Sequence, residues 1–577
     1  MRPTESTSHP YILETSRGSL KGLEQRDLTG KPILYRFAKV PYALPPTGSR
    51  RWRRPQALPH DFTFNSSQGA PGDYTRFGPI CPQPHYDHGS IAIANPNAAP
   101  PVENEQDEDC LYLNIWVPAS APPNKKGWPV QFHIHGGWLQ VGDALQQNDT
   151  DPFDLIASTT PRIIVSPTYR LNLFGFLAGS ELASLQEDAS PSNYGLWDQR
   201  CALEWVAKNI HLFGGDASNI TVGGLSAGAN STFFQLNYDT LLPPEQRLIR
   251  RVYLWSNAVA IQPNPTTSPV LTQQFNDLCA IFGIPSSSRP QEKLERMRQI
   301  PAKDLIASLA KMKMHTFRAS TDDCFVPSTF LSALHSGSFT TRLAENNISV
   351  FLGEVCDEKE LYKIVNPPSS YQGLMTQLAN YYPAHVVKAL LPLYTIPATN
   401  STNAAEWAEV FSQIVADAQV HASLRGLTHI LLNPPQQRPG GAVVKPLPPT
   451  SVHRYRISWR AKNLDRWISP SVGVCHGLDA PIFWASGWRA DFTQEDKRVV
   501  QRFLAPFGSF LAGDEPVQGS RGAIRGERYV RWLAADGNVV DDKEDELWDR
   551  GMRIWDKVWE AQRNLVAKEK ESGESRL

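Results

Sequence analysis

The stretch that most constrains the fold of this chain is residues 219–230, Asn-Ile-Thr-Val-Gly-Gly-Leu-Ser-Ala-Gly-Ala-Asn. A short apolar strand runs into a tight turn, and the following segment, 231–237, is compatible with a helix. Gly224, Ser226 and Gly228 form the pattern G-x-S-x-G, in which a nucleophilic serine stands at the apex of a strained strand-to-helix turn. Three fixed positions also arise by chance, so the pattern alone is equally compatible with an ordinary turn.

Composition and charge exclude several classes of protein. The 577 residues carry 57 Lys and Arg against 58 Asp and Glu, and this balance argues against a nucleic-acid partner or a membrane surface. No run approaches the roughly 18 apolar residues of a membrane helix. The polar residues 1–10 lack the apolar core of a signal peptide. We therefore expect a soluble, cytoplasmic protein without a membrane span.

Apolar strands separated by helices run through much of the chain. Strands are expected at 111–117, 129–135, 163–166, 219–222, 252–255, 349–352 and 452–459. Helices are expected at 196–209 and within 270–345 and 370–432. Nearly all-apolar strands that alternate with helices are typical of a sheet buried on both faces. The sequence therefore predicts an α/β fold with a large, mostly parallel central sheet, preceded by an antiparallel hairpin over 11–22.

We expect a single domain over residues 1–577, with 10–540 as its core, because large α/β sheets can form one unit. The Pro/Asn/Asp/His-rich segment 83–106 is long enough to act as a loop that covers a pocket. Residues 544–568 carry an apolar, Trp-rich stripe, which predicts a C-terminal helix docked on the body. The sequence shows no metal-ligand spacing and no phosphate-binding glycine loop, so no metal and no cofactor is expected.

A serine nucleophile needs a base, an orienting acid and an oxyanion hole. For the oxyanion hole, His135-Gly136-Gly137-Trp138 follows an apolar strand and offers backbone N–H groups in a turn. His476 follows a turn of small residues and is the leading candidate base, with His421, His429 and His453 as rivals. The acid lies among Glu354, Asp357, Glu358 and Glu360, a cluster that is equally compatible with a solvated loop.

Several long motifs, found in order, give the chain a resemblance to a known family. Residues 108–116, Glu-Asp-Cys-Leu-Tyr-Leu-Asn-Ile-Trp, look like the second signature of the type-B carboxylesterases, the carboxylesterase/cholinesterase family of α/β-hydrolases. Residues 213–228 look like that family's active-site signature, and 40–46, 169–176 and 193–199 are also similar to it. The likeness runs from about residue 10 to 516. It implies the α/β-hydrolase fold and a serine carboxylic ester hydrolase whose substrates are a small-molecule ester and water.

The resemblance also implies a set of site residues. His476 matches the family's His-Gly position and would be the base, and Asp357-Glu358 matches its Asp-Glu-Gly, so that Glu358 would be the orienting acid. With Ser226 as the nucleophile, the oxyanion donors would be the backbone N–H groups of Gly137, Trp138 and Ala227.

Four departures from the family pattern accompany this likeness. Leu225 stands where the residue before the serine is usually glutamate, Trp138 replaces the third glycine of the oxyanion turn, and Lys359 replaces the glycine after the acid. A glycine-like backbone angle would be costly at a tryptophan. Relatives that have equivalents of Cys81 and Cys110 are mostly secreted and join these two cysteines in a disulfide. Because no signal sequence is visible here, we expect these two sulfurs to be close but reduced.

Two other functions use the same fold. An acyl-transfer, cyclising or tailoring enzyme of a biosynthetic pathway would pass the acyl group from the serine to another acceptor. Product analysis with a competing alcohol or amine separates it from a hydrolase. A non-catalytic adhesion or scaffold protein is the third possibility, and the complete Ser, Glu and His set argues against it.

Overall fold

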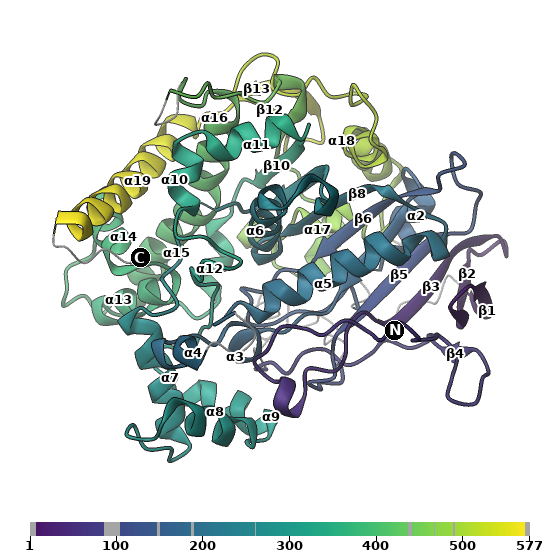
Figure 1. The fold of residues 1–577 in the computed structure, drawn as a ribbon. Helices are drawn as coiled ribbons and strands as arrows, with labels where there is room; N and C mark the ends of the chain where they lie inside the picture. The colour runs from purple at the N-terminus through teal and green to yellow at the C-terminus, as the bar shows by residue number, and fades with distance from the viewer. Residues whose placement is uncertain are drawn as a thin grey trace.

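The computed structural model describes residues 7–85, 104–146, 151–185, 190–259, 261–436, 441–466, 468–488 and 491–571. Their strands are β1 (Thr7–Thr15), β2 (Gly18–Arg26), β3 (Pro32–Pro41), β4 (Gly72–Asp73), β5 (Tyr112–Pro118), β6 (Trp128–Ile134), β7 (Ile163–Pro167), β8 (Gly215–Leu225), β9 (Arg251–Trp255), β10 (Ser349–Val355), β11 (Val452–Ile457), β12 (Tyr529–Leu533) and β13 (Val539–Glu544). They form one sheet in the order β1-β2-β3-β5-β7-β6-β8-β9-β10-β11-β12-β13, with β4 beside β2 (Figure 1).

The centre of the sheet is parallel, from β7 through β6, β8, β9, β10 and β11 to β12. The N-terminal strands β1 and β2 pair antiparallel, as expected for the hairpin over 11–22, and β3 pairs antiparallel with β2. The α/β-hydrolase fold with a mostly parallel sheet is therefore confirmed. One detail differs, because the expected strand 111–117 is β5, which pairs antiparallel with both β3 and β7.

The sequence did not predict β12 and β13. These strands lie at the edge of the sheet, and β13 has the sequence Val-Val-Asp-Asp-Lys-Glu with mostly exposed side chains. An edge strand that faces solvent needs no apolar run, so it lacks the pattern by which the buried strands are recognised.

The described helices are α2 (Phe153–Ser158), α3 (Asn172–Phe176), α4 (Ser180–Leu185), α5 (Tyr194–Asn209), α6 (Ala227–Leu241), α7 (Pro269–Ile281), α8 (Pro290–Arg298), α9 (Ala302–Ser308), α10 (Phe330–His335), α11 (Ser338–Glu345), α12 (Lys359–Ile364), α13 (Tyr371–Tyr381), α14 (Ala384–Leu390), α15 (Ala404–Ala416), α16 (Ala422–Leu432), α17 (Ala480–Phe483), α18 (Gln494–Ala512) and α19 (Trp548–Glu571). The expected C-terminal helix is α19, which begins a few residues later than expected and packs on α14 and α16 (Figure 1).

Successive residues of β9 point to opposite faces of the sheet, as its pleat requires. Val252 and Leu254 belong to one hydrophobic cluster and Tyr253 and Trp255 to another. Helix α6 packs on β8 and β9 on the first face. On the second face the ring of Phe483, from α17, stacks on Trp255 with centroids 4.3 Å apart. Both faces are therefore covered, which explains why the central strands are apolar throughout.

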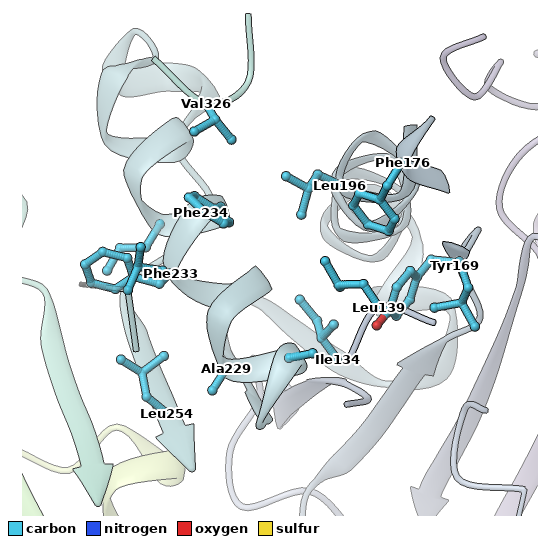
Figure 2. Close-up of a cluster of buried hydrophobic side chains, with 14 of the residues drawn as sticks. Ile134, Leu139, Tyr169, Phe176, Leu196, Ala229, Phe233, Phe234, Leu254 and Val326 are labelled. Carbon is cyan, nitrogen blue, oxygen red and sulfur yellow. The ribbon is translucent and has the colours of Figure 1, made fainter. Parts of the chain in front are cut away.

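Figure 2 shows part of the first cluster. Ile134 from the end of β6, Leu254 from β9 and Phe233 from α6 are among the buried side chains gathered there. The helix that follows the predicted serine turn is thus held in place by the core of the sheet.

Two expectations concern the segment between Cys81 and Cys110. The pocket-covering role was expected for 83–106, and residues 86–103 of it lie outside the described residues. Cys81 and Cys110 are both buried free thiols. A hydrogen bond with Cys81 and burial raise the pKa of the Cys110 thiol well above its ordinary value. Among the helices of the described residues, none is long and apolar enough to cross a membrane.

A buried ionic network joins β10 to α16 and to the segment before α19. Arg425 donates to Glu354 at 2.7 and 3.0 Å and to Asp545 at 2.7 Å. Asp545 also accepts from Arg454 at 2.6 Å, and His421 lies 2.8 Å from Glu354. Burial opposes ionisation of Glu354, but Arg425 and His421 hold the pKa of its carboxyl well below the usual value.

Replacing Arg425 with methionine should destabilise the fold. The change leaves Glu354 and Asp545 as buried charges with fewer partners, and breaking a buried pair in this way costs about 3–5 kcal/mol. Urea unfolding would measure the loss. The matched control is Arg498→Met, because that side chain is 75% exposed and pairs with Glu495, which is also on the surface. Equal stability of the two variants would contradict the structural role of the network.

Candidate active site

Ser226 stands at the junction of β8 and α6. Its backbone has φ 57° and ψ −121°, a conformation that costs energy for any residue but glycine. A Cβ added to Gly224 would lie 2.3 Å from the carbonyl oxygen of Ile134, and one added to Gly228 would lie 2.0 Å from it. The end of β6 therefore packs directly against the turn, and glycine is required at both positions. The Ser226 amide donates to the carbonyl oxygen of Trp255 at 2.9 Å, which ties the turn to β9.

His476 connects Ser226 to a buried carboxylate. Its Nε2 lies 2.7 Å from Ser226 Oγ, and its Nδ1 lies 2.5 Å from Glu358 Oε2. Glu358 is fully buried just after β10, where the Val355 amide donates to its Oε1 at 3.0 Å. The structure thus brings these three residues, which come from distant parts of the sequence, into one hydrogen-bonded chain.

The rival candidates for base and acid are engaged elsewhere. His421 pairs with Glu354, His429 lies 2.8 Å from Glu527, and His453 lies 2.7 Å from Ser520. Asp357 accepts from the Val474 amide at 2.9 Å, and Glu360 accepts from Lys363 at 2.8 Å. One rival base and one rival acid are therefore partners of each other in the ionic network, and neither contacts Ser226.

A second buried carboxylate lies behind Glu358. The hydroxyl of Ser256 is 2.7 Å from Glu358 Oε1 and 2.9 Å from Asp479 Oδ2, and Tyr455 donates to Asp479 at 2.9 Å. A serine hydroxyl has a single proton to donate, so it cannot donate to both carboxylates at once. Burial and the charge of Glu358 raise the pKa of Asp479 to about 6.

Sequence reasoning missed Ser256 and Asp479. Ser256 follows β9 directly, at the carboxyl end of a parallel strand, where sites in open α/β sheets are found. Asp479 comes three residues after His476 in the same turn. These positions were the available signals, but neither residue type is distinctive without the fold.

The turn after β6 lies against the serine. A Cβ on Gly136 would be 3.3 Å from the Cβ of Ser226. Gly137 has φ 103° and Trp138 has φ 58°, so the tryptophan adopts the left-handed angle that a glycine would take more easily. Among the hydrogen bonds of the described residues, none uses the Gly137 amide as a backbone donor. Ala227 opens α6, where helix geometry supplies no acceptor for its amide within the helix.

A cavity of about 150 Å³ opens at Ser226. Trp138 and Ala227 line it beside the serine. Leu139, Asn230 and Phe234 also line it, together with side chains from 257–274, 314–319, 379–383 and 418–419. Residues 417–421 form a π-helical turn, a feature found frequently at functional sites. Within the described ranges no group of three or more His, Cys, Asp or Glu side chains is arranged to hold a metal ion.

The structure shows the contacts of two residues, Leu225 and Lys359, that depart from the family pattern. Leu225 is partly buried and packs against the hydrophobic cluster on the second face of the sheet. Lys359 forms an ion pair with Glu409 of α15 at 2.5 Å. An apolar contact thus stands where an acidic side chain was expected behind the serine.

Nearly the whole chain is similar to known esterases. A model of the carboxylesterase family matches residues 9–547. An uncharacterized esterase/lipase of Schizosaccharomyces pombe is 41% identical over 545 residues, which cover 93% of this chain and 94% of that protein. A carboxylic ester hydrolase of Gibberella moniliformis is 35% identical, with 97% and 98% covered. An acetylcholinesterase of Bungarus fasciatus is 28% identical, with 87% and 78% covered.

Asp479 should make stability depend on pH. Its pKa of about 6 in the folded protein lies above the ordinary value of 3.8, so its contribution to stability is greatest below the ordinary value and is lost as the pH rises through 6. Asp479→Asn removes this dependence. Relative to the unmodified protein, the variant should gain about 1 kcal/mol of unfolding free energy between about pH 5 and about pH 8.

Urea unfolding at the two pH values measures this gain, with Asp61→Asn as the control because Asp61 is an exposed carboxylate. A gain of the same size in the control, or none in Asp479→Asn, would show that Asp479 does not titrate in this range.

Proposed function

Since the chain belongs to the carboxylesterase family and is a carboxylic ester hydrolase, we propose that it cleaves small-molecule esters through an acyl-enzyme on Ser226. His476 is the base and Glu358 the orienting acid. The observation that carries this proposal is the continuous hydrogen-bonded chain from Ser226 Oγ through His476 to Glu358.

In the first step, His476 Nε2 removes the proton from Ser226 Oγ as that oxygen attacks the ester carbonyl carbon. Glu358 keeps the proton of the imidazole on Nδ1, so that Nε2 is free to accept, and it stabilises the imidazolium that forms. Because Glu358 also accepts from the Val355 amide, its position relative to the ring is fixed.

The carbonyl oxygen becomes an oxyanion in the tetrahedral intermediate. The backbone N–H groups of Gly137, Trp138 and Ala227 donate to it, and a donor of this kind contributes roughly 3–4 kcal/mol to the transition state. The protonated His476 then gives its proton to the alkoxide as the C–O bond breaks, and the alcohol leaves. In the second step His476 takes a proton from water, whose oxygen attacks the acyl carbon. The bond from that carbon to Ser226 Oγ then breaks, His476 returns the proton to Oγ, and the acid leaves.

Ser226→Ala should lower kcat/KM for para-nitrophenyl acetate by at least about 10⁴-fold, because both steps need the serine oxygen. The release of nitrophenolate measures the rate, and recovery of acetic acid identifies water as the acceptor. Ser218→Ala, an exposed serine on the same strand, is the matched control and should keep the activity of the unmodified protein. Turnover by Ser226→Ala above a trace would refute the proposal.

A further inference from the structure

Arg318 gives the cavity at Ser226 a positive charge. Among the described residues that line this cavity, it is the only one whose side chain is charged at neutral pH, and the others are apolar, hydroxyl-bearing or carboxamide side chains. No lysine, aspartate or glutamate shares the lining with it. The described lining of the cavity therefore carries a net positive charge.

The contacts of Arg318 fix its position without neutralising it. Its Nε donates to the carbonyl oxygen of Asn380 at 2.5 Å, and its guanidinium carbon lies 4.3 Å from the ring centroid of Tyr381. Burial raises the pKa of Tyr381, and the charge of Arg318 opposes that rise. The tyrosine is thus a neutral partner at physiological pH.

One terminal nitrogen of Arg318, Nη2, is buried and has no hydrogen-bond partner among the described residues. No carboxylate of the described ranges forms an ion pair with this guanidinium. Arg318 itself is only partly buried. Among the buried arginines of the described residues, Arg162 has no carboxylate partner either and donates to Gln131 and Thr160, whereas others form ion pairs. Arg170 pairs with Asp198 at 2.6 Å, Arg200 with Asp239 at 2.7 Å, and Arg425 with two carboxylates.

In those three cases a carboxylate within the fold balances the charge of the guanidinium. Among the described residues Arg318 has no such carboxylate, so an anion that enters the cavity would give its buried Nη2 the hydrogen-bond acceptor that it lacks. A carboxylate fits best, because its two oxygens match the planar fork of the guanidinium and can accept two charge-assisted hydrogen bonds.

We propose that the cavity takes esters that carry a carboxylate group, and that Arg318 determines this specificity by pairing with that group. The inference rests on the proposed function of Ser226, because the two side chains line one cavity. Neutral esters of the same shape leave Arg318 unpaired, and esters with a quaternary ammonium group meet a like charge.

Two pairs of substrates test this and show which part of the ester carries the anion. For the acyl part, para-nitrophenyl hemiadipate is compared with the ester in which an isopropyl group replaces the free carboxylate. For the alcohol part, meta-carboxyphenyl acetate is compared with meta-isopropylphenyl acetate. The readout is the ratio of kcat/KM for the anionic ester to that for its neutral partner, corrected for the rates of hydrolysis by hydroxide.

In one of the two pairs the unmodified protein should prefer the anionic ester, and Arg318→Gln should lower the ratio by about 10-fold to 100-fold, the usual effect of losing a hydrogen bond to a charged group. Arg318→Lys keeps the charge but loses the fork, so its ratio should lie between the two. Arg498→Gln removes one exposed positive charge outside the cavity lining and should keep the ratio of the unmodified protein.

Ratios below one in the unmodified protein for both pairs would overturn the inference, and so would an unchanged ratio in a folded Arg318→Gln. The preference of the unmodified protein decides the matter even if that variant does not fold. If the unmodified protein hydrolyses neither these four esters nor para-nitrophenyl acetate, the proposed function fails, and this inference fails with it. Hydrolysis of para-nitrophenyl acetate but of none of the four overturns only the inference. Hydrolysis of neutral esters without any anionic preference leaves the proposed function intact and overturns only the role of Arg318.

Discussion

The close approach of the end of β6 to the turn between β8 and α6 is the contact on which the site depends. The Ile134 carbonyl leaves no room for a Cβ on Gly224 or Gly228, and the turn between them holds Ser226 in a backbone conformation that would be unfavourable elsewhere. The sheet and α6 supply the packing that balances this strain, because Ile134 and Phe233 belong to one continuous core. The contact that packs the sheet against α6 therefore also places Ser226 at the apex of the turn.

Two carboxylates near the end of β10 belong to separate hydrogen-bonded groups, one in the ionic network and one at the site. Glu354 lies within the strand and pairs with Arg425 and His421, which fastens the C-terminal part of the chain to the sheet. Glu358, just beyond the strand, reaches His476. Each group is buried and fully engaged with cations or hydrogen-bond donors, as buried charge requires. By contrast, Arg318 in the cavity has no carboxylate partner within the described residues, and its Nη2 has no hydrogen-bond acceptor there.

Much of the fold could be predicted because its central strands are buried on both faces and therefore apolar, as in β6, β8 and β9. The last two strands, β12 and the edge strand β13, were not predicted, because side chains that stay partly or fully exposed need not be apolar. Within the site, Ser226 had a local signature, whereas Glu358 could be chosen among its neighbours only by family resemblance. The contact between Ser256 and Asp479 could not be predicted, because it joins residues 223 positions apart. Such a meeting depends on topology and leaves no mark on local sequence.

The central claim is that the acyl group passes through Ser226, and covalent capture tests it most directly. A fluorophosphonate ester reacts with an activated serine and stops at the phosphonylated enzyme, and peptide mass spectrometry locates the adduct. We expect one phosphonyl group per chain, on the peptide that contains Ser226, and no adduct in Ser226→Ala. An adduct on another residue, or equal labelling of the alanine variant, would contradict the account.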